Sequence, residues 1–356
     1  MKVLFDLVHP ADALFFRHAI EALRRNGIDV RIASRDKDVL IPLLDDLGLA
    51  HVPLGRAGRG RAGLAIELLR RDWRLWRLVR RFRPDVMVGF GGVAIAHVGA
   101  LTGIPSLSFY DTEHADLQIR LALPFISEWH VPESWRGAEA GGRTFRFAGG
   151  KQFAYLHPGH FFPSPKIARA TGWDPARDNF LVRTVAWQAN HDHGRSGLST
   201  ARLRELVRVL GARGKVHISA EGALPGDLEP LRYRGGVADF HHLLAHCRLC
   251  CGESITVASE AVTLGVPALL QIDKDYGYVA EQEAAGLISR LHAADDLGQA
   301  VERALAEDRQ AFRARSRAFT ERMGDVNCYI VSQIERLLET RRRPTRIPAG
   351  SRSASA

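Results

Sequence analysis

The stretch GESITVASEAVTLGVPAL, residues 252–269, reads as the end of a strand, a short loop, a helix and the start of another strand. Its loop ends in Ser254, a residue type that commonly caps helices. Thr256 and Glu260 follow in the first turns of the helix. Many parallel-sheet folds hold nucleotides with a strand, a loop and a helix N-terminus followed by an acid. The rest of the chain has to distinguish a helix cap from a ligand site.

The same alternation of strand and helix extends in both directions from this stretch. It begins with KVLFDLV and LFFRHAIEALRRNG, continues to PSLSFYD, and restarts at FLVRTVAW after the Pro/Gly-rich segment YLHPGHFFPSPK. Continuous apolar strands separated by helices predict parallel sheets that are covered on both faces. We therefore expect an α/β protein with two Rossmann-like, doubly wound domains that face each other across a cleft.

The predicted domains comprise residues 1–160 and 161–340, followed by a basic, disordered tail at 341–356. The last helix, at roughly 325–340, could pack on either domain.

The composition is that of a soluble globular protein, with 356 residues, 46% hydrophobic and 25% charged. No apolar run approaches the roughly 20 residues of a membrane span, and the N-terminus does not resemble a signal peptide, so we expect a cytoplasmic protein. Cys247, Cys250 and Cys251 are expected to be buried as small hydrophobic residues. A zinc site there is not expected, because a second pair of ligands at suitable spacing is absent.

The net charge of +9 is concentrated in two segments. Residues 56–83 hold ten arginines against Glu67 and Asp72, and the tail holds five arginines and no acid. A nucleic-acid-binding protein usually has a broader basic surface, so no nucleic acid partner is expected. The helix at 63–83 has two interpretations: a core stripe with a solvated basic face, or a peripheral contact between its Trp and Arg side chains and anionic lipid at the inner face of the membrane.

Ligands of doubly wound sheets bind at the carboxyl ends of the strands. In the first domain, His9 follows the first strand, and Asp111, Glu113 and His114 lie in the strand-end segment YDTEHAD. One of these groups could take a proton from an acceptor hydroxyl or a sugar carbon. The alternative is a polar loop that caps the next helix.

In the second domain, the candidates are residues suited to phosphate and ribose. Arg183 and His191 are interpreted as phosphate donors, whereas a metal at the HDH triplet is not expected. Gly236 and Gly252 lie in turns beside this edge, and Ser254 would lie beside a diphosphate. Thr256 and Glu260 share one helical face, and a carboxylate there can accept both hydroxyls of a ribose.

Together with the two-domain layout, the segments DTEHA, VRTVAWQANHDHG, HHLLAHCRLCCGES and SITVASEAVTLGVPAL resemble a bacterial and archaeal family of unknown function. That family is similar to GT-B glycosyltransferases and to UDP-N-acetylglucosamine 2-epimerase. The resemblance covers roughly residues 1–335. It implies a GT-B-like fold, with Ser254 beside the diphosphate, Glu260 on the uridine ribose and Glu113 at the position of an acid of the sugar pocket.

The sequence departs from this pattern at the phosphate. Ile255 and Thr256 replace two glycines of the epimerase, and the epimerase segment RREN has no equivalent beyond Arg183. The glycine-rich first loop of the lipid-linked N-acetylglucosaminyl transferase is also missing.

These features predict a metal-independent glycosyltransferase that uses a nucleotide sugar, with UDP as the expected nucleotide, in cell-envelope or exported glycan synthesis. The UDP-sugar would be a co-substrate, with no further cofactor, and the acceptor would be a glycan or a lipid-linked molecule. One alternative is a UDP-N-acetylhexosamine 2-epimerase or hydrolase, and another is a non-catalytic protein that binds nucleotide sugars.

Overall fold

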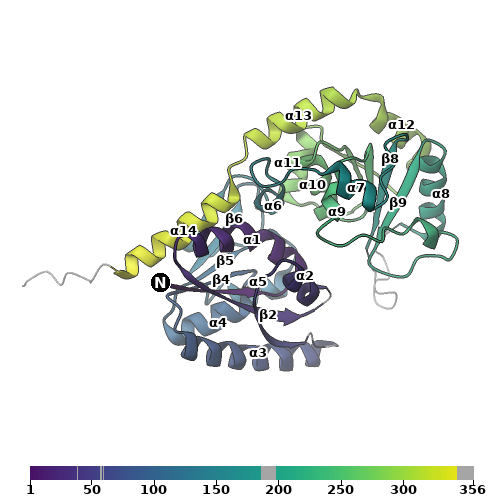
Figure 1. The fold of residues 1–356 in the computed structure, drawn as a ribbon. Helices are drawn as coiled ribbons and strands as arrows, with labels where there is room; N and C mark the ends of the chain where they lie inside the picture. Colours follow the sequence, from purple (N-terminus) through teal and green to yellow (C-terminus); the bar gives the residue numbers. More distant parts are fainter. Residues whose placement is uncertain (38, 57, 59, 186–197, 343–356) are drawn as a thin grey trace, which may run out of the picture.

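Two parallel β-sheets organise the protein, which Figure 1 shows as a computed structural model. The structure describes residues 1–37, 39–56, 58, 60–185 and 198–342. The first sheet has seven strands in the order β3-β2-β1-β4-β5-β6-β7, and the second has five in the order β12-β11-β10-β8-β9. Every strand pairing in them is parallel. The predicted fold class is confirmed.

The N-terminal domain contains the seven-stranded sheet and the helices around it. Its strands are β1 (Lys2–Leu7), β2 (Asp29–Asp36), β3 (Val52–Arg56), β4 (Val86–Phe90), β5 (Ser106–Phe109), β6 (Glu128–Pro132) and β7 (Thr144–Phe147). Its helices are α1 (Pro10–Arg25), α2 (Leu40–Asp46), α3 (Gly60–Phe82), α4 (Val93–Thr102), α5 (Asp116–Ala122) and α6 (Phe153–Leu156). Strands β1 and β4 are buried almost throughout, as continuous apolar strands in a sheet covered on both faces should be.

The C-terminal domain repeats the arrangement on a smaller scale. Its strands are β8 (Asn179–Thr184), β9 (Lys215–Ala220), β10 (Leu249–Gly252), β11 (Ala268–Leu270) and β12 (Ile288–Arg290). Its helices are α7 (Pro165–Ala170), α8 (Thr200–Gly211), α9 (Phe240–Leu244), α10 (Ile255–Thr263), α11 (Gly277–Ala284), α12 (Leu297–Ala306) and α13 (Arg309–Glu321).

Strand β6 shows why apolar periodicity predicts too few strands in the first sheet. Its sequence, EWHVP, places Glu128 and His130 inside a fully buried strand. His130 is satisfied by the Tyr329 hydroxyl at 2.8 Å from Nδ1 and by the Glu128 carboxylate at 3.1 Å from Nε2. Because these partners make burial of the polar side chains tolerable, the strand needs no unbroken apolar run.

The last helix, α14 (Val326–Arg342), packs on the N-terminal domain, which answers the question that the sequence left open. Asn26 of α1 donates to Glu335 at 2.9 Å, and Asn327 donates to the Ala154 carbonyl at 2.6 Å. The preceding helix, α13, is bound to the C-terminal domain, where Ser316 donates to the Val262 carbonyl at 2.5 Å. The chain therefore crosses between the domains a second time between α13 and α14 (Figure 1).

Two expectations drawn from the composition concern the cysteines and membrane-spanning segments. Cys247, Cys250 and Cys251 are buried as expected, and burial raises the pKa of the Cys247 thiol to about 12. Within the described part of the chain, we find no helix with the length and apolar character that crossing a membrane requires.

Candidate functional site

The loops that follow β5 and β11 bring the two domains into contact through Glu113. Its Oε2 accepts the backbone N–H of Gly277 at 2.9 Å, and its Oε1 accepts that of Arg136 at 2.8 Å. Gly277 is the first residue of α11, so the carboxylate of one domain lies at a helix N-terminus of the other, where a negative charge is favourable. In this conformation, Glu113, predicted to be a catalytic base, acts as an interdomain helix cap.

The contact around Glu113 leaves no room for a side chain at Gly277. A Cβ atom there would lie 1.7 Å from the Ser134 carbonyl oxygen. Next to it, Nε2 of His114 lies 2.7 Å from the Asp275 carbonyl, and the His114 ring lies edge-on to Tyr276 with the centroids 4.9 Å apart. His114, also a catalytic candidate, thus contributes to the same interdomain contact.

Glu260 of α10 is buried, with 5% of its surface exposed. Its Oε1 accepts the Tyr155 hydroxyl at 2.5 Å and lies 3.2 Å from Nε2 of His241. Burial, and then the charge of Glu260, raise the pKa of Tyr155, so its phenol stays a donor to this carboxylate. A ribose hydroxyl at Oε1 would compete with the Tyr155 hydroxyl for this oxygen.

Tyr278 of α11 is half-buried and directly follows Gly277, which contacts Glu113. Burial raises the pKa of this phenol first, and the negative charges of Asp111, Glu113 and Glu260 raise it further. Asp111 is half-buried, and its Oδ1 accepts the Thr112 hydroxyl at 3.0 Å. Two of the predicted residues therefore lie at contacts between the domains, Glu113 with Gly277 and Glu260 with Tyr155, and Asp111 lies two positions before Glu113 in the same loop. Asp111, Glu113 and Glu260 are called the interdomain cluster.

Arg183, Gly252 and Ser254 lie at the carboxyl ends of β8 and β10, as predicted. Arg183 donates to Ser219 at 2.8 Å and pairs with Glu221 at 2.5 Å. Ser254 is the N-cap of α10 and accepts the Val257 N–H at 3.3 Å, which is the ordinary capping role. Arg183 and Ser254 thus have partners within the domain, whereas Nε of Arg183 is buried without a hydrogen-bond partner among the described residues.

Three further residues were predicted to bind the sugar-nucleotide donor: Thr256, Gly236 and His191. Thr256 is half-buried on α10. Gly236 lies in a turn where its carbonyl accepts the Tyr233 hydroxyl at 3.0 Å. His191 lies outside the described residues.

His9 is the N-cap of α1, and its Nδ1 accepts the Ala11 N–H at 3.3 Å. The buried Asp12 completes this capping box by accepting the N–H groups of Val8 and His9 at 3.0 and 2.9 Å. Lys151 lies 3.7 Å from Asp12 Oδ1, with its ammonium over the Phe90 ring. The described bonds of the predicted catalytic residue His9 are therefore those of a helix cap.

Sequence reasoning did not single out Tyr155, Tyr278 or Lys151. Tyr278 is the second residue of α11, directly after the loop that follows β11, so its position in the topology was a usable signal. Tyr155 comes from the short helix α6 at the start of the linker, and nothing in its local sequence distinguishes it from a core aromatic residue.

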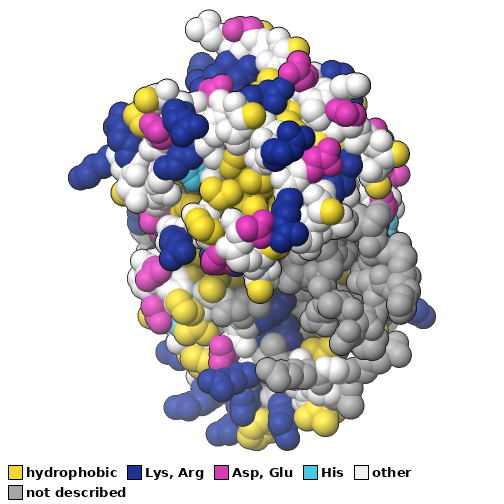
Figure 2. Space-filling view, turned by 90° about the vertical axis from the view of Figure 1, so that its right-hand side faces the viewer, with side chains coloured by type: hydrophobic (Ala, Val, Ile, Leu, Met, Phe, Trp, Pro, Cys, Tyr) yellow, Lys and Arg dark blue, Asp and Glu magenta, His cyan; other side chains and the backbone are white. Residues whose placement is uncertain are grey.

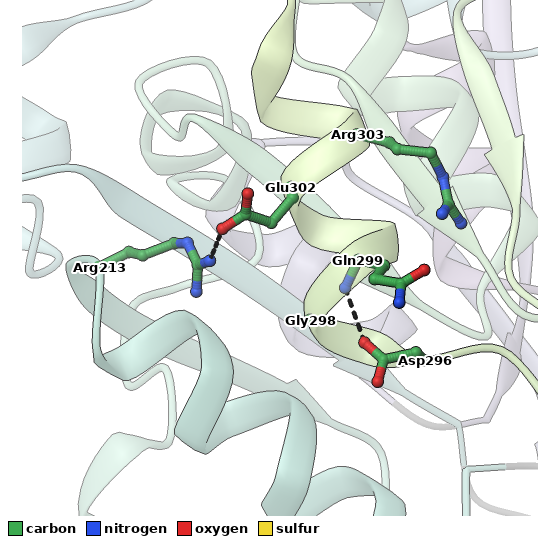
Figure 3. Close-up of a pocket in the computed structure, with 6 residues that line it drawn as sticks. All are labelled: Arg213, Asp296, Gly298, Gln299, Glu302 and Arg303. Carbon is green, nitrogen blue, oxygen red and sulfur yellow. Dashed lines mark hydrogen bonds and ion pairs between the residues drawn. The ribbon is translucent and has the colours of Figure 1, made fainter.

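Figure 3 shows a pocket of about 540 Å³ on the C-terminal domain, lined by residues of α12 and by Arg213. Arg213 pairs with Glu302, and Asp296 caps α12 by accepting the Gln299 N–H at 2.8 Å. None of the predicted site residues lines this pocket. The pocket therefore does not belong to the interdomain cluster.

The fold is similar to those of solved nucleotide-sugar enzymes. The UDP-GlcNAc 2-epimerase from Neisseria meningitidis, solved bound to UDP-GlcNAc, matches with a TM-score of 0.71 and 12% identity, over 94% of this chain and 100% of that one. The UDP-GlcNAc 2-epimerase from Methanocaldococcus jannaschii matches with a TM-score of 0.66 and 17% identity, over 96% and 100%. The spinosyn rhamnosyltransferase SpnG, solved with spinosyn aglycone, matches with a TM-score of 0.62 and 16% identity, over 94% and 100%.

At the level of sequence, the matches concern part of the chain. The uncharacterized protein MJ0665 of Methanocaldococcus jannaschii is 26% identical over 148 residues, which is 41% of this chain and 43% of that protein. Residues 1–163 match the family described as "Protein of unknown function (DUF354)". The expected resemblance is thus confirmed: the first 163 residues match this family, and 94% of the chain is covered by a fold shared with UDP-GlcNAc 2-epimerases and GT-B glycosyltransferases.

Proposed function

We propose that this protein is a GT-B glycosyltransferase that transfers a sugar from a nucleotide donor, with UDP as the nucleotide, to an acceptor in cell-envelope or exported glycan synthesis. The observation that carries the proposal is that two of the predicted acids, beside the carboxyl ends of β5 and β10, make contacts between the domains: Glu113 accepts the Gly277 N–H at 2.9 Å, and Glu260 accepts the Tyr155 hydroxyl at 2.5 Å. Doubly wound sheets bind their ligands at this edge. Similarity to enzymes solved with UDP-GlcNAc or with an aglycone supports the same class of substrate.

In this proposal the donor lies on the C-terminal domain. The diphosphate would lie at the N-terminus of α10, near Ser254 and Arg183, where backbone N–H groups and a guanidinium favour negative charge. The ribose hydroxyls would donate to Glu260 in place of Tyr155. A cation held by the protein fold is sufficient to stabilise a leaving diphosphate, so the proposed transfer needs no metal and no further cofactor.

The acceptor would be activated from the N-terminal domain. Glu113 is engaged by the N–H groups of Gly277 and Arg136, whereas the described hydrogen bond to Asp111 comes from the Thr112 hydroxyl. A base has to accept a new proton through an available lone pair. We therefore assign the base of the transfer step to Asp111.

Nucleotide binding tests the donor site. Titration of the protein with UDP by calorimetry is expected to give a single site, and Glu260→Gln to weaken it roughly 10- to 100-fold, since a hydrogen bond to a charged group contributes about 1.5–3 kcal/mol. Tyr155→Phe is the matched control. It removes the hydroxyl that competes for Oε1, so UDP affinity should be retained or increased.

The two variants show whether Glu260 binds the nucleotide or only stabilises the fold. If Tyr155→Phe weakens UDP binding as much as Glu260→Gln does, the bond between these residues only holds the fold together, and the ribose assignment is wrong. Thermal unfolding of both variants shows whether either has lost its fold.

Helix α3 supports a lipid-linked acceptor. Leu64, Leu69 and Trp73 of α3 are exposed, at 47%, 71% and 54%. Basic and hydrophobic side chains lie together at the bottom of Figure 2, where α3 lies in Figure 1. The apolar stripe that the sequence predicts on this helix consists of Leu64, Leu68, Leu75, Val79 and Phe82. Leu75, Val79 and Phe82 are buried, whereas Leu64 is exposed. An exposed surface of this composition suits an anionic membrane.

A pocket of about 330 Å³ beside α3 has four arginines in its lining. It is lined by Arg31, Val52, Leu54, Arg74, Arg77, Leu78 and Arg81. Among the described residues, no carboxylate forms a salt bridge with these four arginines, whereas Arg35 and Arg71 pair with Glu67 and Asp6. Arg74 donates to the Leu54 carbonyl at 2.7 Å, and Arg31 and Arg77 lie over the rings of Phe82 and Trp73. Guanidiniums without a carboxylate partner favour a phosphate of a lipid headgroup.

Vesicle binding tests the membrane contact. The protein should sediment with vesicles that contain anionic lipid, and replacing Arg74, Arg77 and Arg81 with glutamine should weaken binding by about two orders of magnitude, since each basic residue near such a surface contributes about 1 kcal/mol. The same change at Arg208, Arg303 and Arg313, exposed on the C-terminal domain, should have a much smaller effect. If both variants lose vesicle binding equally, binding depends on the net charge of the protein and not on the surface of α3.

Epimerisation is the second candidate, and the fold shared with UDP-GlcNAc 2-epimerases favours it. Two carboxylates around a sugar C2 could exchange its proton. Proton NMR of UDP-N-acetylglucosamine in deuterated buffer, without an acceptor, distinguishes the candidates. Loss of the C2 proton signal would show that the protein exchanges this proton, as an epimerase does, and would rule against transfer as its activity. A transferase is expected to bind the sugar nucleotide and leave it unchanged.

A further inference from the structure

The two segments that cross between the domains meet at a cluster of histidines and one carboxylate. The first segment is the linker after α6, which contains His157 and His160, and the second is the bend between α13 and α14, which contains Asp325. Nε2 of His160 lies 3.0 Å from Oδ2 of Asp325, although the two residues are 165 positions apart. Figure 1 shows α13 and α14 running from one domain to the other.

A turn in the linker holds the imidazoles of His157 and His160 next to the bend between α13 and α14. The N–H of His160 donates to the His157 carbonyl at 2.8 Å, and Nδ1 of His157 accepts the Gly159 N–H at 3.1 Å. The ring centroids of the two histidines are 6.0 Å apart. One ligand atom from each of His157, His160 and Asp325 lies within 4.8 Å of the other two, and all three residues are half-buried.

Neighbouring groups orient the cluster. Oδ1 of Asp325 accepts the N–H of Asn327 at 2.8 Å at the start of α14, which directs Oδ2 towards His160. His18 of α1 stacks on His160 with ring centroids 5.0 Å apart and an interplanar angle of 19°. Two ring orientations and one carboxylate are therefore held by contacts outside the cluster, as is usual for metal ligands.

We propose that His157, His160 and Asp325 bind a divalent transition-metal ion of the zinc type, which ties together the two crossings between the domains. Two imidazole nitrogens and a carboxylate oxygen are a common zinc donor set, with water in the fourth position. Bond lengths of about 2.1 Å place tetrahedral ligands roughly 3.4 Å apart, so a small contraction of the cluster suffices.

This site is independent of the proposed sugar transfer. The ion would lie at the crossings and take no part in the interdomain carboxylate cluster. Its effect would be on the relative position and stability of the domains, because its ligands come from the linker and from the junction of α13 with α14.

The test is zinc titration of the full-length protein after removal of metals with a chelator, read by calorimetry and by the thermal unfolding temperature. We expect one equivalent to bind at this site and to raise the unfolding temperature. His160→Ala and Asp325→Asn should each weaken this binding at least about tenfold and abolish the thermal shift. Asparagine keeps the capping oxygen for α14, so Asp325→Asn separates loss of a ligand from loss of the helix start.

Two controls make the result decisive. His292→Ala removes an exposed histidine elsewhere, and Cys328→Ala removes the thiol that lies 3.3 Å from Asp325 Oδ2. Both should keep the site. Zinc binding that survives in His160→Ala and Asp325→Asn, or that depends on Cys328 alone, would overturn the proposal, and so would the absence of zinc binding by the unmodified protein.

Discussion

Asp111→Asn is expected to lower kcat by about 10²- to 10⁴-fold, the usual contribution of a general base, with little change in UDP affinity. The change removes the charge and the basicity of the side chain but preserves its shape and an oxygen that can accept the Thr112 hydroxyl. Asp111 belongs to the N-terminal domain, whereas the proposed nucleotide groups belong to the C-terminal domain. Turnover should therefore fall while donor binding persists.

Sugar transfer with a UDP-sugar and a membrane extract as acceptor, and UDP calorimetry on the same preparation, measure the two effects. Asp116→Asn is the matched control, because Asp116 is an exposed carboxylate of the same loop, at the start of α5. Full activity of Asp111→Asn would remove the base assignment. Equal loss in both variants would mean that the loop needs its charge and not a particular base.

Gly252→Ala is expected to destabilise the C-terminal domain by about 3 kcal/mol or more, since steric overlap in a buried backbone is among the largest mutational effects. Gly252 ends β10 with φ +149°, and a Cβ atom there would lie 2.0 Å from the Arg183 carbonyl oxygen. Arg183 is its register partner on β8. No rotamer change relieves this overlap, because both groups belong to the backbone of paired strands.

Urea unfolding followed by circular dichroism measures the loss. Gly211→Ala in α8 of the same domain is the control, since a Cβ atom there meets nothing within 4 Å, and alanine favours helix by up to about 1 kcal/mol. Gly252→Ala should unfold at a clearly lower urea concentration than the unmodified protein, and Gly211→Ala at the same or a higher one. Coincident transitions for both variants would contradict the close approach of β8 and β10.

Much of the fold could be predicted because its signals are local. Continuous apolar strands, helix periods and the linker residues depend on neighbours in the chain, and they predicted two parallel-sheet domains, which the structure confirms. Ser254 as a helix cap and the buried cysteines have the same local origin. Strand β6 was missed for a corresponding reason, because His130 is made compatible with burial by Tyr329, 199 positions away.

The candidate site could be predicted only as a set of loops. Topology indicated that the residues after β5 and β10 would lie at the ligand edge, and the structure places Glu113 and Glu260 of these segments at contacts between the domains. Their different roles depend on partners that no local pattern indicates. Glu113 bonds to Gly277, 164 positions away, and Glu260 bonds to Tyr155, 105 positions away.

By itself, the sequence determined the fold class, the two-domain order and the loops in which chemistry could occur, since hydrophobic periodicity and capping act over a few residues. Only the tertiary structure decided that Glu113 caps α11, that Tyr155 covers Glu260, that α14 returns to the N-terminal domain and that His160 meets Asp325. The physical reason is that a buried polar group requires a partner, and which partner it obtains depends on how distant segments pack.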